Sequence, residues 1–153
     1  MIFQKLNSMD KELLLKDLSA RLPYGVKCRI KGERSKILIG INPEGLLFRG
    51  RTPDKADWCY DCYDIEEWSI LPYLRPLSSM TEEEKKDILQ LLNIHGDIDN
   101  EGNLLLGVEC NIVTLKVCKK YLGELNKRMF DVCHMIEKGL ALEAPEGMYT
   151  LNK

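Results

Sequence analysis

The sequence lacks long apolar runs, an excess of one charge sign, and a dense set of aromatic residues. Its uninterrupted aliphatic runs are only a few residues long, whereas a membrane-spanning helix needs about 20 apolar residues, so no such helix is predicted. The 22 Lys and Arg residues nearly balance the 24 Asp and Glu residues. Because this balance gives no global basic field, binding to nucleic acid would need a local basic patch.

The chain also lacks the short motifs that mark common enzymes. It has no nucleophile-elbow motif, no paired-histidine zinc motif and no phosphate-binding loop, and it contains only two histidines. We therefore predict a protein that is not an enzyme and that needs no cofactor. Its 153 residues, 44% of them hydrophobic, suit a soluble globular protein, which we expect in the cytoplasm.

Six cysteines are present, but the N-terminal residues are too polar for a secretory signal. We expect reduced thiols rather than a disulfide framework. Cys59 and Cys62 form a CxxC spacing that could hold zinc or act as a redox pair. The spacing lies in a strand-like aromatic run, where an odd step of three places the two thiols on opposite faces. No metal site is therefore predicted.

The pattern of apolar residues predicts strands first and helices later. A helix is expected over residues 10–22, with Asp10 as its N-cap, and residues 1–9 are expected to form a poorly ordered leader. Alternation then predicts an antiparallel meander over residues 26–30, 37–41 and 46–49, with a fourth strand over residues 58–65.

The second half of the chain carries the helical signals. Residues 66–79 contain two prolines, and we expect an irregular segment with one helical turn at most. Thr81 and Glu84 form a capping box for a helix that Gly96 ends. A fifth strand is expected near residues 104–112. Thr114 is expected to cap a third helix, and Asp131 a short final one.

The apolar face of the third helix is expected to comprise Leu115, Cys118, Leu122, Leu125 and Met129. Together the elements predict an α+β fold. We expect an antiparallel sheet of about four to five strands with three main helices packed on it, in a single domain over residues 10–153.

Basic residues share one phase of the predicted meander. Lys27, Arg29, Lys31, Arg49 and Arg51 fall on outward positions of neighbouring strands, where they could bind phosphate groups. Leu47 shares their phase, and no RNA-binding aromatic pattern accompanies them. A solvated sheet face is therefore the main interpretation, and a nucleic-acid-binding face is the alternative.

Three blocks of the sequence resemble a protein family. Residues Lys11–Lys27, Tyr73–Thr81 and Ile136–Tyr149 are similar, in this order, to blocks of a family of uncharacterised proteins from phages, prophages and mobile elements of gut bacteria. The chain departs from relatives at Val132–Met135, and its CxxC is not a family feature. The resemblance implies an accessory protein in the cytoplasm of a bacterial host, and it transfers no activity.

Two function hypotheses follow. The first is a non-enzymatic protein-binding module that acts on a host or phage protein, and the second is a nucleic-acid-binding accessory protein. Tyr73, Arg75 and Tyr149 lie in the family blocks, in irregular proline-containing sequence. They either pack these segments onto the core or form a recognition surface, because Arg and Tyr are enriched in binding hot spots.

Overall fold

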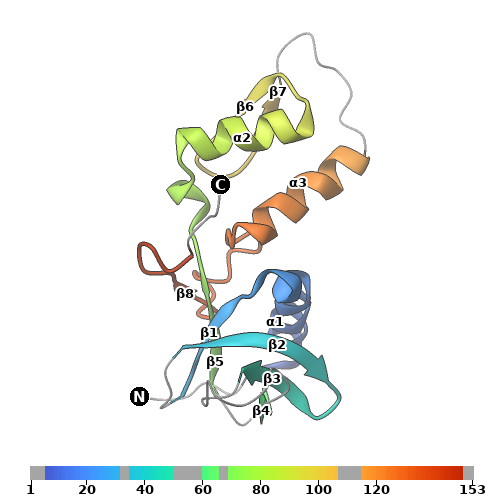
Figure 1. Ribbon diagram of the computed structural model, residues 1–153, viewed down its shortest axis with the longest axis vertical. Coiled ribbons are helices and arrows are strands. Elements are labelled where there is room, and N and C mark those ends of the chain that lie inside the picture. Colours follow the sequence, from blue (N-terminus) through green and yellow to red (C-terminus); the bar gives the residue numbers. More distant parts are fainter. Residues whose placement is uncertain (1–5, 32–34, 50–59, 66–68, 107–114, 150–153) are drawn as a thin grey trace. The chain divides into compact units, whose positions relative to one another are not determined.

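The computed structural model describes residues 6–31, 35–49, 60–65, 69–106 and 115–149, and it shows an α+β protein (Figure 1). Contacts divide the chain into two compact units, the first from residues 1–73 and 137–142 and the second from residues 74–136 and 143–153. The predicted α+β class is confirmed. The prediction of one domain over residues 10–153 stays a prediction.

The described residues contain three α-helices, two sheets and two short 3-10 helices, Leu22–Tyr24 and Leu77–Ser79. The helices are α1 (Ser8–Arg21), α2 (Glu82–Leu92) and α3 (Leu115–Lys127). The larger sheet has the order β4-β3-β2-β1-β5-β8, from Tyr60–Tyr63, Gly45–Arg49, Lys36–Asn42, Lys27–Ile30, Ile70–Leu74 and Leu142–Glu143. The smaller sheet pairs β6 (Gly96–Ile98) with β7 (Leu104–Leu106). The larger sheet thus has six strands, not the four to five expected.

The antiparallel meander of β1, β2 and β3 is confirmed, and β4 joins it beside β3. The Asn42–Gly45 turn forms as its composition predicts, because the Asn42 side-chain oxygen accepts hydrogen bonds from the Glu44 and Gly45 backbone N–H groups, both at 2.9 Å. Gly45 is required there, since a Cβ atom at this position would collide with the Tyr63 carbonyl oxygen.

A β-bulge interrupts the pairing of β2 with β3. Leu38 lies opposite Phe48 and Gly40 opposite Leu47, so Ile39 is the extra residue. The bulge shifts the alternation by one, which lets both Leu38 and Ile41 lie on the side of the buried Phe48 and Leu46. It also leaves Ile39 on the opposite side, where 38% of its surface is exposed.

The strand β5 corrects the expectation of an irregular segment around Pro72. Its residues pair antiparallel with β1, with Pro72 opposite Cys28. The Leu74 carbonyl accepts a hydrogen bond from the Ala144 N–H at 2.8 Å. In a strand, the backbone groups of every second residue point to the same edge. Pro72 is two residues before Leu74, so the backbone N–H that proline lacks would point toward β8. Strand β8 is only two residues long. A proline is tolerated at such a position.

The core of the first unit is formed by α1 and one face of the sheet. Buried residues on α1 include Leu14 and Leu18. The helix begins two residues before its predicted start, because Asn7 rather than Asp10 is the N-cap and accepts a hydrogen bond from the Asp10 N–H at 2.7 Å. Residues 1–5 of the predicted leader lie outside the described residues.

The second unit has its own core between α2, α3 and the smaller sheet. Ile88 and Leu92 of α2, Ile98 of β6, and Tyr121 and Leu125 of α3 pack together there. The two later helices thus share a core with a two-stranded sheet, which corrects the expectation of three helices on one sheet. Of the predicted strand over residues 104–112, residues 107–112 lie outside the described residues.

Three predictions of helix ends and faces were wrong. Leu125 and Met129 are buried as predicted, but Cys118 and Leu122 are exposed and Tyr121 is buried, so the core face of α3 differs in part from the predicted one. Asn93, in a left-handed conformation, ends α2, and Gly96 begins β6. Asp131 caps turns rather than a helix.

The turns after α3 are held by the Asp131 carboxylate. It accepts hydrogen bonds from the Met135 N–H at 2.7 Å and from the Ile136 N–H at 3.0 Å. Asp131 itself is 5% exposed. In a helix, these two N–H groups would donate to backbone carbonyls of the preceding turn. Here they donate to a side chain instead, so the segment forms turns and not a helix.

Candidate binding face

The candidate site is the face of the larger sheet that points away from α1. In β1, β3 and β5, alternate residues are buried. The charge of Asp17 on α1 raises the pKa of the buried Cys28, so α1 lies on the buried side. The other side, here called the outer face, consists of Lys27 and Arg29 of β1, Ile37 and Ile39 of β2, Leu47 and Arg49 of β3, Cys62 of β4, and Leu71 and Tyr73 of β5.

Strand register places four of these residues in one row across the outer face. Lys27 lies directly opposite Ile37. Cys28 lies opposite Pro72 in the antiparallel pair of β1 and β5, so the next pair along places Lys27 opposite Tyr73. Leu38 lies opposite Phe48 in the pair of β2 and β3, so the next pair along places Ile37 opposite Arg49. The row therefore reads Tyr73, Lys27, Ile37, Arg49, with one basic side chain on each side of the isoleucine.

The centre of the outer face is aliphatic. The bulge directs Ile39 and the bare Gly40 toward the same side as Leu47, and a Cβ atom on Gly40 would lie 3.2 Å from Leu47 Cδ1. Leu47 therefore packs over the glycine backbone, next to Ile39. Ile37 and Leu71 are half-buried on the same face. Three aliphatic side chains, Ile37, Ile39 and Leu47, thus form an apolar strip over β2 and β3. Leu71 lies apart from this strip, on β5 and opposite Arg29.

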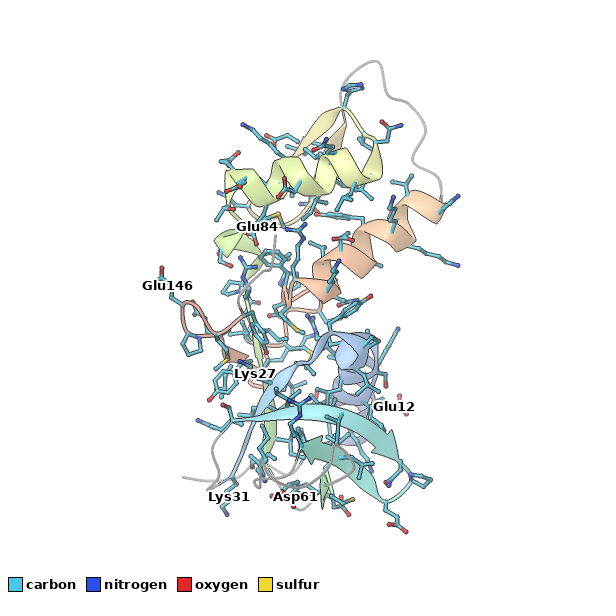
Figure 2. All side chains as sticks on the ribbon, viewed as in Figure 1. Glu12, Lys27, Lys31, Asp61, Glu84 and Glu146 are labelled. Atoms are coloured by element: carbon cyan, nitrogen blue, oxygen red, sulfur yellow. The ribbon has the colours of Figure 1, made fainter. Side chains whose placement is uncertain are left out.

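The outer face carries positive charge and no described carboxylate on its strand positions. Arg29 and Arg49 are exposed, and neither forms an ion pair with a described residue. Lys27 is half-buried, and Lys31 is exposed just after β1, with the two lysines at opposite ends of the strand (Figure 2). Arg51, the fifth predicted basic residue, lies outside the described residues.

A second charged cluster lies on the opposite side of the same sheet. The Lys36 ammonium group donates to Asp61 Oδ2 at 2.7 Å and to the Tyr63 hydroxyl at 3.1 Å. Burial lowers the pKa of Lys36, but the hydrogen bonds to Asp61 and Tyr63 outweigh it, so the net pKa is raised. Lys36 therefore stays charged, and it ties β2 to β4 across the intervening β3.

Arg75 lies in the second unit, where its guanidinium group forms an ion pair with Glu84. Its two terminal nitrogens donate to the two carboxylate oxygens of Glu84 at 2.8 and 2.9 Å, and its Cζ lies 4.2 Å from the centre of the Phe130 ring. The backbone of Arg75 also bonds to Met129 and Asp131, at 2.7 and 2.8 Å. Only 18% of the Arg75 side chain and 9% of the Glu84 side chain is exposed.

Glu84 joins this pair to the start of α2. Its carboxylate also accepts a hydrogen bond from the Thr81 N–H at 3.0 Å, which completes the predicted capping box. Burial raises the pKa of Glu84, but the hydrogen bonds from Arg75 and Thr81 lower it more, and the net pKa is lowered. The spacing of Thr81 and Glu84 predicts the capping box, but no local pattern indicates that Arg75 joins it.

The three predicted partner-binding residues, Tyr73, Arg75 and Tyr149, are divided between the two units. Tyr73 belongs to the first unit and lies on the outer face, beside the predicted basic residues. Arg75 and Tyr149 belong to the second unit, and Tyr149 is half-buried. The structure therefore combines Tyr73 with Lys27, Arg29 and Arg49, which belong to the nucleic-acid hypothesis in the sequence analysis.

The described cysteines are free thiols in contrasting surroundings. Burial, with a smaller contribution from the Asp17 charge, raises the pKa of Cys28 far above its ordinary value. Cys62 is exposed on β4, and Cys59 lies outside the described residues. Within the part of the chain that the structure describes, no three His, Cys, Asp or Glu residues are grouped so that they could hold a metal ion.

Comparisons with protein-family models, with curated proteins and with solved structures find no match to this chain. Among the described residues, no helix has the length and apolar character needed to cross a bilayer.

Proposed function

We propose that this protein is a non-enzymatic binding module that holds a protein partner on the outer face. The observation that carries the proposal is the exposed Ile39, which lies in an aliphatic strip with Ile37 and Leu47. Lys27 and Arg49 flank this strip on either side of Ile37. Protein interfaces combine an apolar centre with a polar rim and are enriched in Arg. The positive rim selects a partner whose own rim is acidic.

Nucleic acid is the second candidate, supported by the row in which Tyr73 stands beside Lys27. Single-stranded nucleic acid binds where bases stack on aromatic rings within a basic groove. On the outer face, however, the centre is formed by Ile37, Ile39 and Leu47, which offer no ring for stacking. These three aliphatic residues gain more from contact with an apolar protein surface, so the protein partner is favoured.

The resemblance to phage and mobile-element proteins supplies the context of the proposal. A module of this kind would act on a host or phage protein within the cytoplasm of a bacterial host. Surface complementarity is sufficient for such a role, because binding to a host protein can block or redirect it without any catalytic group.

The proposal is tested by affinity purification from infected or prophage-bearing cells with three forms of the chain. The forms are the natural chain, the variant Ile39→Asp, and the double variant Arg29→Glu with Arg49→Glu. We expect the natural chain to retain a protein that both variants lose. A matched control, Lys16→Glu with Lys119→Glu, changes the charge by the same amount at exposed positions on the helices α1 and α3 instead of on the sheet, and it should retain the partner.

Two results would contradict the proposal. The first is a set of retained proteins that is identical for the natural chain and both outer-face variants. The second is a partner that disappears after nuclease treatment, which would make nucleic acid the ligand. Circular dichroism of each variant separates lost binding from lost folding.

A further inference from the structure

We infer that the occupant of the outer face is an amphipathic helix with acidic residues on both sides of its apolar stripe, lying along β2. The inference rests on the proposed function, because it names the shape and charge of the partner segment for that same face. It follows from the arrangement of the apolar strip and of the two basic flanks around it.

The width of the outer face matches one helix. Lys27 on β1 and Arg49 on β3 stand on either side of Ile37, two strand spacings apart. Neighbouring strands lie about 4.8 Å apart, so the two basic flanks are separated by roughly 10 Å. An α-helix with its side chains is about 10–12 Å across. One helix over β2 would therefore reach both flanks.

The order of basic and aliphatic side chains across the outer face favours a helix over an extended strand. The face presents basic, aliphatic and basic positions in one row, at Lys27, Ile37 and Arg49. A strand directs one row of side chains, every second residue, toward a surface. A helix presents an apolar stripe with a different set of side chains along each edge. Of these two, the helix is the one that can place carboxylates on both edges while its apolar stripe covers Ile37, Ile39 and Leu47.

The carboxylates have defined recipients. Arg29 and Arg49 are exposed and make no ion pair with a described residue, and guanidinium groups bind carboxylates through two parallel hydrogen bonds. Lys27 adds charge on the β1 side. We therefore expect acidic residues at spacings of three and four along each edge of the helix, where they line up on one side.

Designed peptides test this inference while the natural partner is still unidentified. β2 has seven residues and spans about 23 Å, which a helix of about 15 residues covers. Three peptides of that length are compared for binding to the full chain. The first has an apolar stripe with Glu on both edges, the second has the same stripe with Lys on both edges, and the third has the composition of the first in scrambled order.

We expect the first peptide to bind saturably and at least about tenfold more tightly than the other two. Reversing the charge at Arg29 and Arg49 to Glu should weaken the first peptide about tenfold and strengthen the second. Ile39→Asp should weaken the first. The control, Lys16→Glu with Lys119→Glu, should bind like the natural chain.

Three outcomes overturn the inference. They are equal binding of the first and scrambled peptides, no binding of the first peptide, and displacement of the first peptide by a tighter-binding single-stranded oligothymidine. If affinity purification yields a protein partner that depends on Ile39 while the first peptide fails, the helical occupant is wrong and the binding module stands. If purification yields no such partner, the proposed function fails first.

Discussion

Truncation of Arg75 should destabilise the second unit, and this result would separate the two roles considered for that residue. Arg75→Ala removes two hydrogen bonds to Glu84 and the contact with the Phe130 ring. It also leaves a carboxylate that is 9% exposed without its cationic partner. Loss of one partner costs about 3–5 kcal/mol for a fully buried pair and up to about 1 kcal/mol for an exposed one.

The partial exposure of this pair places the expected loss at about 2–3 kcal/mol. Urea unfolding followed by far-ultraviolet circular dichroism measures it. Because the folded pKa of Glu84 is lowered, the pair contributes stability above the ordinary carboxyl pKa and loses it as the pH falls through the folded value. Glu84→Gln should therefore flatten the acid limb of the stability curve.

A loss below about 1 kcal/mol for Arg75→Ala, with an unchanged acid limb for Glu84→Gln, would refute this reasoning. Arg75 would then be available to a partner, as the recognition hypothesis requires. Arg75→Lys is a useful third variant, because a single ammonium group keeps the charge but cannot reproduce the paired hydrogen bonds. We expect it to recover only part of the lost stability.

Four further predictions concern turns, a helix and thiols. Gly45→Ala should lower the free energy of unfolding by at least about 2 kcal/mol, because the added Cβ would collide with the Tyr63 carbonyl. Gly123→Ala lies on α3, where an added Cβ meets nothing within 4 Å, and it should raise the free energy of unfolding in urea by up to about 1 kcal/mol. Asp131→Ala should cost about 1–3 kcal/mol, since two backbone donors lose their acceptor; an unchanged midpoint would contradict this. A thiol reagent at a mildly alkaline pH should label the exposed Cys62 and leave the buried Cys28 unmodified until unfolding, and fast labelling of Cys28 in the folded chain would show that its burial is wrong.

Features with local causes were predictable from the sequence. The alternation of Val26, Cys28 and Ile30 with polar residues predicted β1, because apolar residues at every second position are typical of a half-buried strand. The capping box of Thr81 and Glu84 fixed the start of α2, since both of its hydrogen bonds join residues three apart. The Asn42–Gly45 turn has the same local character.

Features that depend on distant partners were not predictable in the same way. Pro72 argued against a strand, and β5 forms because β1 pairs with it and only a short strand lies on the other side. The core face of α3 was predicted correctly at Leu125 but not at Leu122, because Leu122 and Tyr121 are both plausible apolar residues. Packing against Ile98 and Leu92 selects Tyr121.

The candidate site was predictable in part for the same reason. The shared phase of Lys27, Arg29 and Arg49 was visible in the alternation, and these residues do lie on one face. Tyr73 joins them only through the pairing of β5 with β1, which Pro72 concealed. The exposure of Ile39 depends on a bulge, and a bulge leaves no reliable signal in a run of aliphatic residues.

Site-specific photocrosslinking tests the central claim most directly. A photoreactive phenylalanine derivative is placed at Ile39 in one form of the chain and at Leu122 in another. The two aliphatic side chains have similar exposed fractions, 38% and 45%, but Ile39 lies on the outer face and Leu122 on α3. After irradiation in bacterial cells, a partner on the outer face should give a protein adduct at position 39 that is lost when Arg29 and Arg49 are both changed to Glu, and none at position 122. An adduct at position 122 alone, or an adduct at position 39 that survives the charge reversal, would contradict the claim.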